Sequence, residues 1–334
     1  MDPVTQGALG AAATLAIAPR SRVFPAALLG GLSGMAPDLD VLIRSSTDPL
    51  LSLEYHRQFT HALLFIPVGG LGCALALFAF VRTKLGFLTT YGYCCLGYAT
   101  HGLLDACTSY GTQLLWPFST LRVAWNNVSV VDPLLTLPLL ALLLLAVFRR
   151  APRLARAGLA WVLLYLAIGL VQRERATWAG WELARSRGQT PAAVVAKPSF
   201  ANLVLWKTIY EYQGIYYVDA VRLLGTPIVF SGQTAPALKL ARDYPWLTRQ
   251  TQQARDVERF RWFSEGFIAR DPDRPARVID IRYSVVPNRI EALWGIELDA
   301  SAPADTHARF FTSRELSPED RAELTQMLWP SPRD

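Results

Sequence analysis

Apolar residues gather in uncharged runs, all of them in the first half of the chain. The six runs span residues 3–19, 23–37, 62–81, 86–104, 133–148 and 157–172. A membrane-spanning helix needs about 20 apolar residues, a length that the run 62–81 has, whereas shorter runs are typical of tilted, re-entrant or sheltered segments. Glycine and proline inside the runs favour close helix contact in a membrane bundle. The pattern predicts an α-helical polytopic membrane bundle of about six segments, with a soluble all-α core as the alternative.

The second half of the chain has no long apolar run and an ordinary charge content. Residues 1–172 hold 11 Lys/Arg and 7 Asp/Glu, whereas residues 173–334 hold 22 and 20. Partly alternating β-branched and aromatic residues predict strands within 203–221 and 277–286. Helices are predicted at 255–270 and 317–329, the second with a capping box from Ser317 to Asp320. We therefore predict a membrane-embedded domain, residues 1–172, followed by a small α+β domain, residues 173–334.

Basic residues of the first half lie in short clusters that join consecutive runs. The formal net charge of +6 could suggest a nucleic-acid partner, but clusters between apolar runs indicate membrane orientation instead. Three connections carry these clusters: residues 20–22 between the first two runs, 82–84 between the third and fourth, and 149–156 between the last two. By the positive-inside rule these three connections are cytoplasmic. Every acidic residue of the first half then lies outside. The pattern predicts a multi-pass protein of a bacterial-type cytoplasmic (inner) membrane with an extracytoplasmic C-terminal domain, and no nucleic-acid partner.

Three of the four histidines fall at the predicted outer ends of the runs, together with three carboxylates. This set comprises Asp38, Asp40, His56, His61, His101 and Asp105. His101 and Asp105 are four residues apart and therefore share one helix face. A single buried histidine is more often a hydrogen-bonded core residue. These six residues, however, are all expected at the same depth in the membrane, and all have side chains that can bind a metal. Imidazole and carboxylate ligands suit zinc, manganese or iron, so we predict a metal site.

The spacing within this set leaves alternatives open. His56 and His61 would point about 140° apart on one helix, so either His56 belongs to the preceding loop or His61 alone begins the helix. Asp38 and Asp40 also point in different directions in a helix or a strand. One of the two could bind metal while the other orients a histidine, or two metals could share the set. His307, in the second half, is interpreted as a structural residue.

The sequence resembles the membrane-bound metal-dependent hydrolase family, the YdjM-like proteins, over roughly residues 1–148. The resemblance is carried by the order of "MDPVTQGALG" at the start, "PDLD", "HRQFTH", "HGLLDACTSYGTQLLWPF" and "VDP" at 131–133. It implies a metal site made by the six residues above. Family members commonly have histidine where this chain has Gln6, and an amide is a poor zinc ligand. Gln6 therefore either leaves one metal position without its ligand or hydrogen-bonds a ligand or substrate.

These observations predict an integral membrane metal-dependent hydrolase with its site at the outer face. Bound metal would lower the pKa of water toward about 7, and one of Asp38, Asp40 or Asp105 could be the general base if it is not a ligand. Arg57, and less directly Arg122, could hold an anionic group. The substrate expected is a membrane lipid or other amphiphile, as a phosphoester, although a lipid amide or ester fits nearly as well.

The alternative from another class is a non-catalytic metal-binding membrane protein, acting as a sensor, transporter or assembly scaffold. The inner halves of the runs have no ionisable residue, which argues against a transport pathway. Neither a P-loop nor a G-x-S-x-G motif is present. The pattern does not predict an oligomeric state.

Overall fold

The chain divides into two compact units in the computed structural model, which describes residues 1–313 and 315–329. Unit 1 comprises Met1–Ile43, Tyr55–Val171 and Phe200–Asn202. Unit 2 comprises Arg44–Glu54, Gln172–Ser199 and Leu203–Asp334. Unit 2 therefore includes a short segment, Arg44–Glu54, that lies in the sequence between two parts of unit 1.

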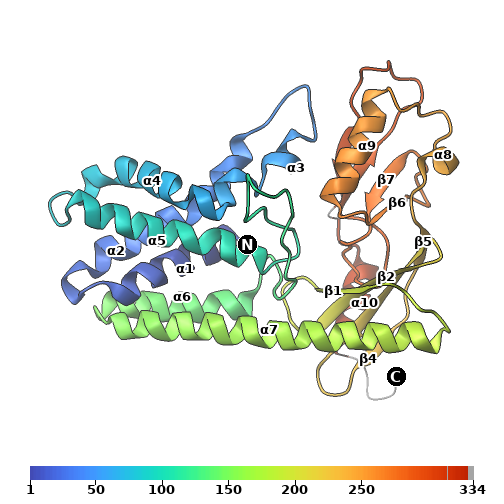
Figure 1. The fold of residues 1–334 in the computed structure, drawn as a ribbon. Helices are drawn as coiled ribbons and strands as arrows, with labels where there is room; N and C mark the ends of the chain where they lie inside the picture. Colours follow the sequence, from blue (N-terminus) through green and yellow to red (C-terminus); the bar gives the residue numbers. More distant parts are fainter. Residues whose placement is uncertain (314, 330–334) are drawn as a thin grey trace. The chain divides into compact units, whose positions relative to one another are not determined.

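Unit 1 is helical (Figure 1). Its helices are α1 (Pro3–Ile17), α2 (Val23–Met35), α4 (Ile66–Val81), α5 (Phe87–Ala106), α6 (Pro133–Phe148) and the first part of α7 (Pro152–Ser186). Short 3-10 turns connect them: η1 (Arg20–Arg22), η2 (Ala36–Leu42), η3 (Phe59–His61) and η4 (Leu63–Phe65). Asp2 and Asp132 cap α1 and α6 by accepting from backbone N–H groups of the first turn. A proline follows each cap, which explains why both Asp-Pro pairs begin helices.

Within the residues that the structure describes, two helical segments are long and apolar enough to cross a membrane, Leu63–Val81 and the helix Pro152–Ser186. Helices α1 and α6 are apolar but shorter, so the expected six membrane segments stay a prediction. Helix α7 also continues past the predicted domain boundary at residue 172 and ends at Ser186. The α1–α2, α4–α5 and α6–α7 connections, which carry the basic clusters, lie at the same end of the helical unit (Figure 1).

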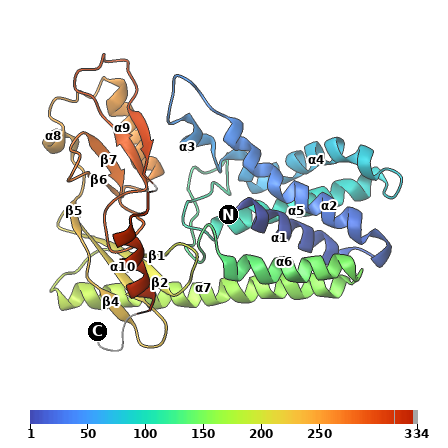
Figure 2. The same cartoon turned by 180° about the vertical axis from the view of Figure 1, so that it is seen from behind.

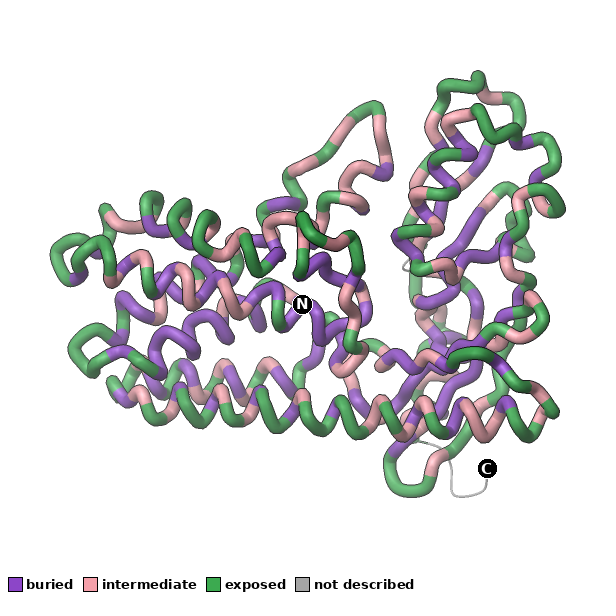
Figure 3. Tube along the Cα trace, viewed as in Figure 1, coloured by how far each residue is buried: buried purple, intermediate pink, exposed green. Residues whose placement is uncertain are grey.

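Helices α1, α2 and α5 form the tightly packed centre of unit 1, where buried residues concentrate (Figure 3). Their backbones approach closely because glycines face each other. A Cβ placed on Gly10 would lie 2.3 Å from the carbonyl oxygen of Gly30, and one on Gly97 would lie 2.4 Å from the same oxygen. No side chain larger than hydrogen fits at these positions, as in small-residue contacts between membrane helices.

Unit 2 contains two antiparallel sheets. The first comprises β1 (Val194–Pro198), β2 (Leu205–Tyr212), β3 (Ile215–Arg222), β4 (Ile228–Phe230) and β5 (Thr234–Pro236), with β5 also paired to β3. The second comprises β6 (Ile268–Arg270), β7 (Arg277–Asp280), β8 (Trp294–Glu297) and β9 (Arg309–Thr312) in that order. The helices are α3 (Leu51–Tyr55, whose last residue belongs to unit 1), α8 (Leu240–Asp243), α9 (Gln252–Phe263) and α10 (Pro318–Leu328).

The predicted elements of unit 2 are confirmed in part. Residues 203–221 contain the β2–β3 hairpin, beside which α10 lies (Figure 2). Helix α10 begins with the predicted capping box, and its Met327 packs against Leu205 and Ala220 of these strands. The strand predicted at 277–286 is shorter and ends at Asp280. The helix predicted at 255–270 is wrong at its end: α9 stops at Phe263, and residues 268–270 form β6. Glu265 and Gly266 adopt positive φ, which terminates the helix despite its continuing apolar pattern.

Candidate metal centre

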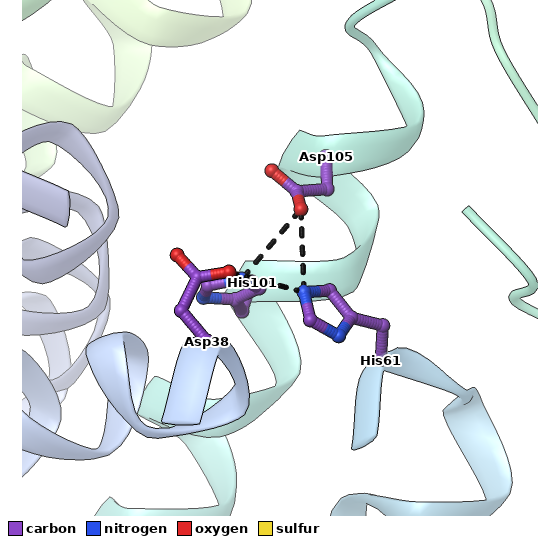
Figure 4. Close-up of side chains that lie close together, drawn as sticks. All are labelled: Asp38, His61, His101 and Asp105. Carbon is purple, nitrogen blue, oxygen red and sulfur yellow. Dashed lines mark ion pairs between the residues drawn. The ribbon is translucent and has the colours of Figure 1, made fainter. Parts of the chain in front are cut away.

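Four side chains from three separate elements of unit 1 are directed to a common point (Figure 4). Asp38 lies on η2, His61 ends η3, and His101 and Asp105 lie one turn apart on α5. The i, i+4 spacing on α5 places the last two on one face, as predicted. His61, His101 and Asp105 are buried, whereas the carboxylate of Asp38 is partly exposed.

The separations between the ligand atoms match the edges of a small metal cage. Asp38 Oδ1 lies 3.4 Å from His61 Nε2 and 3.3 Å from His101 Nε2. Asp105 Oδ2 lies 3.3 Å and 3.6 Å from the same two nitrogens. Ligands bound at about 2.0–2.1 Å in a tetrahedron are about 3.3–3.4 Å apart, whereas the longer bonds of calcium would need wider spacing. The cage could therefore hold a first-row divalent ion.

The buried ligand atoms have no hydrogen bonds of their own. Nε2 of His61, Nε2 of His101 and Oδ2 of Asp105 are buried without a hydrogen-bond partner in the described part of the chain. His101 Nδ1 lies 2.6 Å from the carbonyl oxygen of Gly34. A carbonyl only accepts, so Nδ1 must carry the proton, and in the neutral ring the lone pair is on Nε2, facing the cage. Buried polar atoms without hydrogen bonds are costly. A shared cation would satisfy both imidazole nitrogens and also Asp105 Oδ2, which is otherwise in an ion pair with Arg57.

The carboxylate of Asp40 makes a second group of contacts beside the cage. It lies 2.7 Å from His56 Nδ1 and accepts hydrogen bonds from the Arg57 backbone N–H (3.0 Å) and the Thr60 hydroxyl (2.8 Å). It also lies 3.3 Å from His61 Nδ1. Asp40 thus orients two histidines, which is one of the alternatives that the sequence left open. The ligand atoms of Asp38, Asp40 and His56 also lie close enough together to share an ion.

The buried carboxylates of the centre favour positive charge among them. Burial alone would raise the pKa of Asp40, but hydrogen bonds from His56 and His61 hold this pKa well below its usual range. Burial would likewise lower the pKa of the His61 imidazole, yet the carboxylates of Asp105, Asp38 and Asp40 raise it to about 10. Carboxylates that stay charged although buried favour a cation among them.

Asp105 is held by groups outside the cage. Gln6, buried on α1, donates from Nε2 to Asp105 Oδ1 at 2.8 Å, and the Met1 amine contacts the same oxygen. Arg57 places Nε 3.0 Å from Asp105 Oδ2 and donates from Nη1 to the Thr108 hydroxyl. Gln6 therefore hydrogen-bonds a residue of the cage.

Arg57 and Arg122, the two predicted anion-binding residues, both place their guanidiniums over one aromatic ring. Their guanidinium carbons are 4.7 Å and 5.5 Å from the ring centre of Tyr110, which also contacts His56 edge-on. Arg122 donates to the Gly111 carbonyl at 3.0 Å. The φ of Arg57 is +65°, an uncommon value for a residue with a side chain, and such strain is concentrated at functional sites. The backbone contact with Asp40 helps to hold this conformation.

Sequence reasoning missed the supporting residues of the centre. Thr60 lies inside the "HRQFTH" motif and Tyr110 inside "ACTSYG", so both were marked by motifs but not singled out. The Gly34 carbonyl that orients His101 belongs to the backbone and leaves no signal in the sequence. His307 lies in unit 2, pairs with Asp256 through Nδ1 (2.9 Å) and is not one of the residues of the cage.

Comparisons with known proteins give one family and one distant relative. The sequence model of the family described as "YdjM inner membrane protein" matches residues 1–176. "Uncharacterized protein YfhP" of Bacillus subtilis (strain 168) is 28% identical over 137 residues, which are 40% of this chain and 41% of that protein. The match thus spans less than half the length of this relative. No solved structure matches significantly.

Proposed function

Because the chain belongs to the YdjM inner membrane protein family, we propose that it is an inner-membrane hydrolase that uses the cage of unit 1 as its metal centre. The observation that carries the proposal is the set of four converging ligand atoms, in which each histidine nitrogen lies 3.3–3.6 Å from both carboxylate oxygens and the buried atoms lack hydrogen bonds. Two imidazoles and two carboxylates suit zinc, with manganese or iron as alternatives.

A divalent ion in the cage would supply water activation and polarise the bond under attack. The side chains around it have distinct roles in this proposal. Asp38 is the partly exposed member, so the substrate approaches from its side. His56 is 22% exposed and bonded to Asp40 through Nδ1, which leaves Nε2 to accept a proton as general base. Arg57 and Gln6 keep Asp105 charged and oriented.

The substrate proposed is an amphiphile with an anionic group, such as a lipid phosphoester. Membrane family membership supports a lipid-like substrate, and the two guanidiniums around Tyr110 supply positive charge next to His56. We further propose a multi-pass arrangement with the centre and unit 2 outside. The three basic connections at one end of the helical unit support this orientation.

The test uses the purified protein in detergent with chromogenic phosphodiesters and short-chain phospholipids. Hydrolysis is expected to disappear with a chelator, to return with zinc, and to be lost in Asp38→Asn. His56→Ala is expected to lower kcat while one tightly bound ion remains. Loss of an ion in His56→Ala would instead make His56 a ligand of a second metal.

A non-catalytic metal-binding protein is the second candidate. Four protein ligands complete a tetrahedral shell, which is typical of structural rather than catalytic zinc. The two candidates differ in one outcome: a fully metal-loaded protein that hydrolyses no phosphoester, ester or amide substrate supports the non-catalytic one.

A further inference from the structure

The segment Arg44–Glu54 connects two groups of the candidate metal centre. It begins four residues after Asp40 and ends two residues before His56. Asp40 and His56 contact each other in unit 1, whereas the segment between them packs as part of unit 2. The chain between these contacting residues is therefore a closed loop, and whatever holds the loop restrains both of its ends.

One arginine of unit 2 holds this loop at two points. Arg259, on α9, donates from Nη1 and Nη2 to the two carboxylate oxygens of Asp48, at 3.0 Å and 2.7 Å. Its Nε donates to Glu54 Oε1 at 2.5 Å. The bidentate pair with Asp48 is the geometry in which a guanidinium fixes a carboxylate most firmly. Asp256, one turn earlier on α9, accepts a further bond from Nη1 and orients the guanidinium.

The segment itself has a defined local structure that can transmit this restraint. The Ser45 hydroxyl accepts from the backbone N–H of Thr47 and Asp48, and Asp48 accepts from the N–H of Leu50. Leu50 is buried at the start of α3. Helix α3 then runs to Tyr55, the residue before His56. A capped helical turn therefore connects the carboxylates held by Arg259 to His56.

Resting on the proposed metal centre, we propose that Arg259 is a positioning residue for that centre. It fixes the loop through Asp48 and Glu54. Because His56 directly follows α3, this restraint determines the position of the His56 side chain relative to Asp40. The C-terminal part of the chain then has a function in the reaction: it stabilises the loop of the metal centre.

The experiment compares full-length Arg259→Ala with two variants in detergent. Arg187→Ala is the matched control, because Arg187 is a similarly exposed arginine of unit 2 with a bidentate pair to Asp219, outside the loop. Arg259→Lys keeps the charge but loses the planar fork. The readouts are amide hydrogen exchange of residues 44–61, zinc affinity and kcat.

Arg259→Ala is expected to exchange faster through His56 and to lose kcat. It is also expected to bind zinc about tenfold more weakly, because the other end of the loop carries Asp40, which orients the ligand His61. Arg259→Lys should recover part of each, and Arg187→Ala should change none, although it lowers the unfolding temperature. Faster exchange that stops at Glu54, with zinc affinity and kcat as in the wild type, would overturn the proposal, as would equal effects in Arg187→Ala. A wild-type protein that binds no zinc would contradict the metal centre itself, and the exchange at His56 would still decide whether Arg259 holds that residue.

Discussion

Replacing Gly97 by alanine is expected to disrupt the metal centre without touching a ligand. A Cβ on Gly97 would lie 2.4 Å from the Gly30 carbonyl oxygen and 2.7 Å from the Gly30 Cα, whereas ordinary contact begins at 3.4 Å. Both obstacles are backbone atoms, so no rotamer change relieves them, and α5 must move about 1 Å away from α2. Overpacking of this kind costs about 1–3 kcal/mol.

The displacement matters because α5 carries two residues of the cage and the turn η2, which directly follows α2, carries a third. His101 lies one turn beyond Gly97 and is oriented by the carbonyl of Gly34 on α2, while Asp38 follows the end of α2. A shift of about 1 Å exceeds the tolerance of roughly 0.2 Å in metal–ligand distances, so zinc should bind at least tenfold more weakly.

The assay is competition for zinc with a chromogenic chelator, combined with thermal unfolding. Gly92→Ala is the matched control on the same helix, because a Cβ there meets nothing within 4 Å. It should bind zinc as the wild type does. Wild-type zinc affinity in a folded Gly97→Ala protein would refute the reasoning that glycine contacts set the cage.

Three further predictions follow from the same structure. Gln6→Leu should keep the metal stoichiometry but weaken zinc affinity about tenfold, since Asp105 loses an orienting donor, and unchanged affinity in the chelator assay would limit Gln6 to packing. Burial lowers the pKa of Lys207 in unit 2 to about 7, so the unfolded state binds the extra proton between pH 7 and about 10 and stability should rise with pH. Lys207→Met should remove about 1.4 kcal/mol per pH unit of this slope in chemical unfolding, and an unaltered slope would show that Lys207 does not titrate there. An alkaline-phosphatase fusion after Gly188 should be active, and activity of a cytoplasmic reporter at that position would reverse the proposed orientation.

Local pattern was sufficient to predict one half of the cage. The spacing of His101 and Asp105 determines a shared helix face, and α5 provides it. The apolar runs also coincide closely with helices, because apolar composition and Asp-Pro starts are local signals. The number of membrane crossings is not determined by these signals, since several helices are shorter than a span.

The roles of individual groups depended on tertiary contacts that no local pattern contains. Asp38 and Asp40 look alike in "PDLD", yet Asp38 faces the cage and Asp40 orients His56. Arg57 stands beside His56 and suggested anion binding, which stays a prediction; its pairing with Asp105, 48 residues further along the chain, was not foreseen. The end of α9 at Phe263 was missed because the positive φ of Gly266 outweighs the helical pattern.

Metal content of the purified protein tests the central claim most directly. Elemental analysis of the wild type should find at least one first-row divalent ion per chain. His61→Ala and His101→Ala should each lose it, whereas His307→Ala, whose imidazole pairs with Asp256 in unit 2, should retain it. Equal metal content in the wild type and all three variants, or none in any of them, would contradict the assignment of Asp38, His61, His101 and Asp105 as a metal centre.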